Sequence, residues 1–240
     1  MRALLLSHQA VRRLVTFASM IALSGLAEAG ERTAEFAVRW RSVDGGPASL
    51  QEIGNLFKIQ GEPVVLNVRY FVVSQSLAPA SPAPILRERT SQAKTDVTWK
   101  IRSATDWDKT KSNQWCPLVG KVKSKEEVDV TVRKGNALKR TFSRSCTVKS
   151  SIDAALPKEM TAIPQGCKAR VTRLESPDEV VTIEQWAFDG DPALYLEVSM
   201  KGEDSKQLLK AFKSSYVSPR LSAGVIPLDS SKTQLGTSCK

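Results

Sequence analysis

Two basic residues separated by one position, Lys100 and Arg102, lie in a segment whose side chains alternate in polarity. In residues 95–104 (TDVTWKIRSA), apolar side chains alternate with charged and hydroxyl ones, which is the period of two expected of a β-strand. A lysine and an arginine on one face of a strand can bind phosphate through charge-assisted hydrogen bonds. On an ordinary surface strand the same pair would be solvated, so the segment alone leaves both interpretations open.

The same alternation recurs in other predicted strands and collects charged side chains on one face of a sheet. The basic members are Arg39, Arg41, Lys100, Arg102, Lys125, Arg133, Lys168 and Arg170, and the acidic members are Glu35, Glu127, Asp129, Glu184 and Glu197. Carboxylates are ligands that Mg²⁺ and Mn²⁺ prefer. Such a face either meets water over an apolar core, or lines a closed sheet in which it must bind an anion or metal ions.

The first 29 residues have the pattern of a signal peptide. A basic start is followed by an apolar run and by the sequence AEA at 27–29, an A-x-A cleavage site. The apolar run is shorter than a membrane span, so we expect an exported mature protein, periplasmic or secreted, without a transmembrane segment. The only histidine, His8, lies in the signal peptide. Its removal excludes Ser-His-Asp triads, Cys-His pairs and imidazole-based zinc sites.

The mature chain is predicted to be basic and disulfide-bonded. The formal net charge of +10 falls to about +8 when three arginines and one glutamate leave with the signal peptide, so we expect a phosphate-rich anion or an anionic surface as partner. Export and the lack of an aromatic-basic motif argue against nucleic acid. In an oxidising compartment an even number of cysteines predicts two disulfides, with three possible connectivities. The four are Cys116, Cys146, Cys167 and Cys239.

Strands dominate the predicted secondary structure. We expect eight, at residues 34–43, 64–74, 96–103, 121–133, 138–149, 167–174, 179–188 and 193–201. Helices are expected at 47–57 and 203–212, with a short helical turn at 151–156. This is an α+β fold of mostly antiparallel strands. We expect one domain over residues 30–217, with a Pro-rich loop at 76–94 and an irregular tail at 218–240.

The order of these elements resembles the CYTH-like superfamily of triphosphate tunnel proteins, which includes thiamine triphosphatases, inorganic triphosphatases and class IV adenylate cyclases. The resemblance covers about residues 34–201. It rests on a strand that begins with glutamate, a helix, and then LNVRYFVV, TWKIR, EEVDV, CKARV and YLEVS in that order. It implies a closed or nearly closed barrel of eight antiparallel strands with helices packed outside. It also implies an inner face that binds triphosphate through lysine and arginine, and Mg²⁺ or Mn²⁺ through glutamates.

Carried over residue by residue, the resemblance implies two basic pairs, at 100/102 and 168/170, an acidic pair at 127/129 and a closing glutamate at 197. With the other members of the charged face, the predicted anion-binding residues are Arg39, Lys100, Arg102, Arg133, Lys168 and Arg170. The predicted metal ligands are Glu35, Glu127, Asp129, Glu184 and Glu197. The family's opening motif is Glu-x-Glu-x-Lys, whereas residues 35–39 read EFAVR. Ala37 therefore replaces one carboxylate of that motif.

Three functions remain open on the sequence. The first is an exported protein whose basic tunnel or groove binds phosphate-rich anions without full catalytic competence, because Ala37 removes a metal ligand. The second is a phosphohydrolase that acts on triphosphate or polyphosphate with Mg²⁺ or Mn²⁺. The third is a structural or interaction module of the cell envelope, in which the charged face is solvated. The sequence does not choose between an enzyme and a binding protein.

Overall fold

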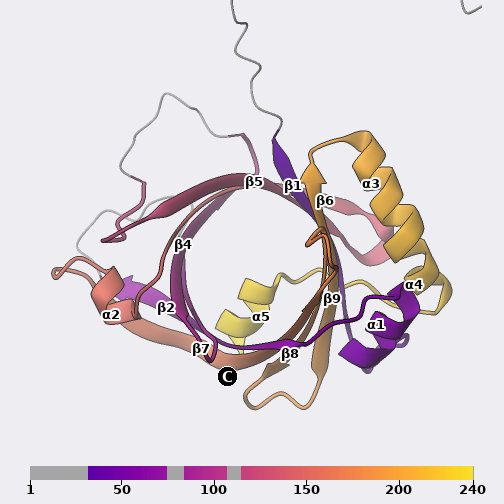
Figure 1. The fold of residues 1–240 in the computed structure, drawn as a ribbon, viewed down its shortest axis with the longest axis horizontal. Coiled ribbons are helices and arrows are strands. Elements are labelled where there is room, and N and C mark those ends of the chain that lie inside the picture. Colours follow the sequence, from indigo (N-terminus) through magenta and orange to yellow (C-terminus); the bar gives the residue numbers. More distant parts are fainter. Residues whose placement is uncertain (1–31, 75–83, 107–114, 240) are drawn as a thin grey trace, which may run out of the picture. The chain divides into compact units, whose positions relative to one another are not determined.

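The computed structural model describes residues 32–74, 84–106 and 115–239. In this part of the chain nine strands close into a barrel in the order β1-β5-β6-β4-β3-β2-β7-β8-β9, with most of the helices outside (Figure 1). The predicted α+β fold with a closed barrel is confirmed. The predicted signal peptide, residues 1–29, lies outside the described residues, as does most of the Pro-rich segment before residue 84.

All eight predicted strands are present, although β7 begins earlier than predicted. The strands are β1 (Thr33–Arg41), β2 (Val64–Ser74), β3 (Ile85–Thr90), β4 (Thr95–Ser103), β5 (Lys123–Val132), β6 (Leu138–Val148), β7 (Thr161–Glu175), β8 (Val181–Phe188) and β9 (Leu194–Glu203). Neighbouring strands pair antiparallel, except that β1 and β5 are parallel. The strands are thus mostly antiparallel, as predicted.

Strand β3 corrects the prediction of a loop over residues 76–94. Its sequence, ILRERT, follows a Pro/Ala/Ser-rich run and carries charge at three of six positions, so it lacks the apolar character of the other strands. It is nevertheless paired along both edges, with β2 and with β4. This pairing satisfies its backbone groups, and tertiary context therefore overrides a weak local propensity.

The described segments contain five α-helices: α1 (Leu50–Phe57), α2 (Ile152–Ala155), α3 (Lys206–Phe212), α4 (Ser218–Ser222) and α5 (Lys232–Ser238). A 3₁₀ turn (Lys134–Asn136) joins β5 to β6, and a π-helical segment (Lys213–Val217) joins α3 to α4. Helices α1 and α3 begin after the N-cap residues Ser49 and Ser205, whose hydroxyls accept backbone hydrogen bonds. The three predicted helical segments are confirmed.

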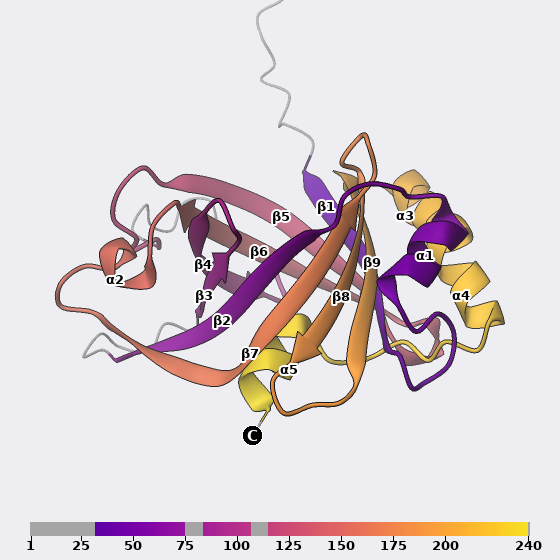
Figure 2. The ribbon, with the colours of Figure 1, turned by 60° about the horizontal axis from the view of Figure 1, so that its bottom comes forward.

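The C-terminal tail, predicted to be irregular, contains α4 and α5. Helix α5 begins with a capping box, in which Ser231 accepts a hydrogen bond from the backbone N–H of Gln234 and the Gln234 side chain accepts one from that of Ser231. Figure 1 shows α5 within the ring of strands, and Figure 2 shows it beside β7. It contacts β7 and β2. The prediction failed because a helix of seven residues is too short to show a helical period.

Apolar side chains pack mainly on the outside of the barrel. Phe36 and Val198 of the strands pack with Ile53 and Phe212 of the helices, and Trp99 packs in a second cluster under α2. A third cluster, of Tyr70, Val171, Trp186 and Phe188, lies on the inner face of the strands, with Leu235 of α5 against it. The charged side chains of most strands therefore face the interior of the barrel rather than water.

Two disulfides join the four cysteines, as predicted, and the structure gives their connectivity. Cys116 is bonded to Cys146 of β6, and Cys167 of β7 is bonded to Cys239, directly after α5. The second disulfide therefore ties the C-terminal helix to the barrel wall. Among the described residues, none of the helices has the length and apolar character needed to cross a bilayer.

Candidate functional site

A cavity of about 190 Å³ inside the barrel is lined almost entirely by charged side chains. The basic lining residues are Arg39, Arg87, Arg89, Lys100, Arg102, Lys125, Arg173, Lys201 and Lys232, and the acidic ones are Glu35, Glu127, Asp129 and Glu184. Nine cations thus face four carboxylates. A concave site with this excess of positive charge favours an anionic guest.

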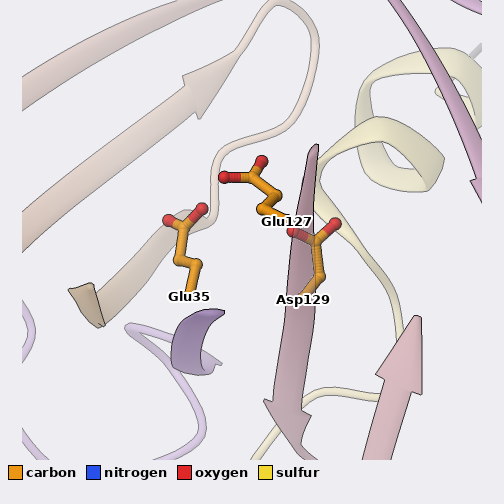
Figure 3. A group of neighbouring side chains, drawn as sticks. All are labelled: Glu35, Glu127 and Asp129. Atoms are coloured by element: carbon orange, nitrogen blue, oxygen red, sulfur yellow. The ribbon is translucent and has the colours of Figure 1, made fainter. Parts of the chain in front are cut away.

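The acidic side of the cavity is formed by β1 and β5. These strands run parallel with Glu35 beside Asp129, and a period of two places Glu127 on the same face as Asp129. The three carboxylates offer oxygen atoms that all lie within 4.8 Å of one another. Figure 3 shows Glu35, Glu127 and Asp129 pointing toward one another. Three carboxylates at this separation fit the hard oxygen ligands that Mg²⁺ or Mn²⁺ requires.

Lysine and arginine side chains already form ion pairs with two of these carboxylates. Lys100 Nζ lies 3.0 Å from Glu127 Oε1 and 3.1 Å from Asp129 Oδ2, and Arg102 Nε lies 3.2 Å from Asp129 Oδ2. Lys125 also pairs with Glu127. Burial alone would raise the pKa of Glu127, but Lys100 and Lys125 lower it to about 2. The cluster is therefore anionic at neutral pH, and a metal ion that binds there would replace Lys100, Lys125 and Arg102 as the partner of these carboxylates.

The carboxylates of Glu184 and Glu197 form a second acidic group on β8 and β9. The two residues are directly opposed in the antiparallel register, and each is at most 2 % exposed. Lys232 Nζ of α5 lies 2.6 Å from Glu184 Oε2 and 2.7 Å from Glu197 Oε1. Burial would raise the pKa of Glu184, but Lys232 and Arg173 keep it well below its usual range. These two predicted metal ligands do not join the cluster around Glu35.

Two basic residues that the sequence analysis missed, Arg87 and Arg89, face the cavity from β3. Neither forms an ion pair with a carboxylate in the described part of the chain, and the Nε atom of each is buried without a hydrogen-bond partner. Burial and the neighbouring Arg89 lower the pKa of Arg87 to about 9. The alternation R-E-R within ILRERT could have indicated a strand with two arginines on one face. It was overlooked because the segment follows a Pro-rich run that predicted a loop.

The predicted anion-binding residues separate into three groups. Arg39, Lys100 and Arg102 line the cavity. Arg133 does not, but it lines an adjoining cavity of about 430 Å³ that shares Arg39 and Arg102 with the first. The remaining two, at positions 168 and 170, lie elsewhere.

Lys168 and Arg170 are exposed and line a separate pocket with Asn67. Their predicted place among the inward-facing residues is therefore wrong. The reason is the alternation of β7: Arg173 faces the cavity, and a period of two places Val171 on the same side and Arg170 on the other. On this strand the apolar residues face inward because they pack in the cluster that includes Trp186.

No protein-family model matches the chain, and no curated protein sequence matches it significantly. Solved structures do match. HpAC1 from Hippeastrum, a proposed adenylyl cyclase with a dominant triphosphatase activity, aligns over 86 % of this chain and 96 % of its own, with a TM-score of 0.50 and 9 % identity. PH1012 from Pyrococcus horikoshii aligns over 84 % and 98 %, with a TM-score of 0.42 and 14 % identity. PH1819 from the same organism aligns over 80 % and 92 %, with a TM-score of 0.40 and 11 % identity.

Proposed function

We propose, from the CYTH-like tunnel fold that this chain has, that its charged cavity binds the phosphate groups of a phosphate-rich anion such as triphosphate. The observation that carries the proposal is the pair Arg87 and Arg89, two neighbouring cations that face the cavity and have no carboxylate partner among the described residues. Partly buried cations without a counter-ion are costly to the folded state. A phosphate group would offset that cost, since guanidinium groups bind phosphate oxygens in a bidentate manner.

Lys100 and Arg102 extend this site from the neighbouring strand, β4. Both form ion pairs with Asp129, at 3.1–3.2 Å. A divalent cation bound by Glu35, Glu127 and Asp129 would neutralise these carboxylates and leave the two basic side chains available to phosphate. The proposed site therefore combines two arginines that have no ion pair among the described residues with basic residues that metal binding would release from Asp129.

Binding without full catalytic competence is the function that we propose, because of Ala37. This residue lines the cavity on β1, between Glu35 and Arg39, and is 2 % exposed. A methyl group offers a metal no ligand, so β1 contributes one carboxylate where the resemblance implied two. A metal ion held by fewer carboxylates is bound less tightly, so it is less often in place to neutralise the charge that develops on a transferred phosphoryl group.

A second candidate function is phosphohydrolysis, and the convergence of Glu35, Glu127 and Asp129 within 4.8 Å favours it. A bound Mg²⁺ or Mn²⁺ would supply Lewis-acid chemistry there. Lys100 and Arg102 would stabilise the charge of the phosphoryl group. Release of inorganic phosphate from tripolyphosphate, lost in Glu127→Gln, would establish this function, and a rate equal to that of a protein-free control would exclude it.

We also propose that the mature chain is exported, since two disulfides are typical of an oxidising compartment. N-terminal sequencing of the protein from its native host tests this proposal. A mature chain that begins at Gly30 is the expected result, and an intact Met1 would contradict it.

The test of anion binding compares arginines inside and outside the barrel. We expect tripolyphosphate to raise the melting temperature of the oxidised protein, because a ligand at a hundred times its Kd adds about 2.7 kcal/mol of stability. Arg87→Ala and Arg89→Ala should each weaken binding about 10- to 100-fold, since hydrogen bonds to charged groups contribute about 1.5–3 kcal/mol. Arg170→Ala is the matched control and should bind like the wild type. Equal losses at residues 87 and 170 would contradict the proposal.

A further inference from the structure

The structure assigns Lys232 of α5 a role of its own: it is a built-in cation for the buried carboxylate pair Glu184 and Glu197, and it keeps divalent metal out of that pair. A metal ion is then confined to Glu35, Glu127 and Asp129. The part of this inference that concerns the confined metal rests on the proposed function, whereas the role of Lys232 does not.

The four oxygens of the Glu184–Glu197 pair all have nitrogen donors. Lys232 Nζ bridges the pair, at 2.6 Å from Glu184 Oε2 and 2.7 Å from Glu197 Oε1. Arg173 Nε donates to Glu184 Oε1 at 2.9 Å, and Trp186 Nε1 donates to Glu184 Oε2 at 2.9 Å. The last oxygen, Glu197 Oε2, accepts from Arg39. The pair therefore has no oxygen left for a metal ion unless one of these donors moves away.

Helix α5 is held in a way that keeps the ammonium group in place. Cys239 is bonded covalently to Cys167 of β7, and Lys232 also lies over the Trp186 ring, with Nζ 5.2 Å from its centroid. At Gly236, a Cβ atom would come within 2.4 Å of the Tyr70 ring, so only glycine allows this approach of α5 to β2. With the helix held in this way, a change of side-chain conformation that takes the ammonium group out of the pair would lose both ion pairs and the contact with Trp186.

Glu35 differs from Glu184 and Glu197 in its contacts. It lines the same cavity, but it forms no ion pair with a lysine or arginine of the described residues, although Glu127 and Asp129 lie close enough to share a cation with it. The two acidic groups of the cavity thus differ in availability. Among the described residues, the first group includes one carboxylate without an ion pair, Glu35, whereas every oxygen of the second group accepts a hydrogen bond from the chain itself.

The test measures Mn²⁺ binding directly, by electron paramagnetic resonance of the free ion, and needs no activity. We expect one Mn²⁺ per wild-type chain, an affinity at least tenfold lower in Glu127→Gln, and an affinity within about twofold of wild type in Glu197→Gln. Lys232→Ala should bind one Mn²⁺ more than the wild type, because two buried carboxylates lose their cation. An equal loss of affinity in Glu127→Gln and Glu197→Gln, or an unchanged number of ions in Lys232→Ala, would overturn the inference.

A second measurement decides the role of Lys232 even if the wild type binds no Mn²⁺, a result that would refute the proposed metal site. Lys232→Ala should melt at a lower temperature than the wild type, and Mn²⁺ should restore several degrees of that loss. Lys201→Ala is the control, since Lys201 lines the same cavity without an ion pair to a described carboxylate. A response to Mn²⁺ that is the same in both variants would overturn the inference. If Lys232→Ala does not fold, Lys232→Gln, which keeps the length of the side chain, takes its place.

Discussion

Two walls of the barrel interior carry charged side chains, and they differ in how that charge is balanced. On β3, Arg87 and Arg89 face the cavity without a carboxylate partner among the described residues. On β8 and β9, Glu184 and Glu197 are bound by donors of the chain at every oxygen. The balance of charge, rather than its amount, separates a wall whose arginines have no ion pair among the described residues from a wall whose carboxylates are paired within the chain.

The largest expected effect on stability comes from removing one carboxylate of the Glu184–Glu197 pair. Glu184→Leu keeps a similar volume but leaves Arg173 and Lys232 with one carboxylate fewer. Removing one partner of a buried ion pair costs about 3–5 kcal/mol, because the remaining charge is no longer compensated. We expect a loss of this size in the free energy of unfolding, measured with urea.

The control for this variant is Glu175→Gln, which removes another carboxylate near Arg173. Glu175 is 40 % exposed and lies 3.4 Å from the same arginine, so the change should stay within about 0.5 kcal/mol. Similar losses of unfolding free energy in the two variants would show that the pairing of every oxygen of Glu184 and Glu197 does not stabilise the fold.

The next largest expected effect is a dependence of the free energy of unfolding on pH, and it comes from Glu127. The pKa of Glu127 falls from 4.5 to about 2 on folding, so its contribution is fully present above about pH 4.5 and is lost as the pH falls toward 2. The pKa difference corresponds to about 3 kcal/mol. Glu127→Gln should therefore lose much less stability than the wild type between about pH 5 and pH 3 in urea unfolding. Parallel curves for the two proteins would contradict the assignment.

Much of the fold could be predicted from sequence because closing a barrel preserves the alternation of its strands. The alternating runs at 34–43 and 121–133 predicted β1 and β5, together with the charged face that each turns inward. The resemblance of element order to the CYTH-like superfamily predicted the closed barrel, and the likeness to HpAC1 confirms that fold. Periodicity could not reveal β3, because half of its residues are charged.

Site residues could be predicted where the alternation of one strand placed charged side chains on a single face. They could not be predicted where segments that are distant in sequence meet. Lys100, Glu127 and Asp129 were found in this way, and they lie in one cavity. Arg170 was misplaced, because alternation on one strand gives two faces without saying which one the closed barrel turns inward. Lys232 was missed because its role depends on a short helix that a disulfide attaches to β7.

The smallest expected effect is a gain in the free energy of unfolding rather than a loss. It tests the β3 wall, which carries Arg87 and Arg89. Arg87→Met keeps most of the apolar stem of the side chain but removes a cation whose pKa burial and Arg89 have lowered to about 9. Loss of an uncompensated charge should raise the free energy of unfolding by about 1 kcal/mol in anion-free buffer, since residues kept for binding often reduce stability. The stabilisation that tripolyphosphate adds should fall in the same variant. Arg170→Met, outside the barrel, should change neither quantity by more than about 0.5 kcal/mol. If Arg87→Met destabilises the anion-free protein as Glu184→Leu does, then Arg87 has a structural partner, and the two walls do not differ in the way that their contacts indicate.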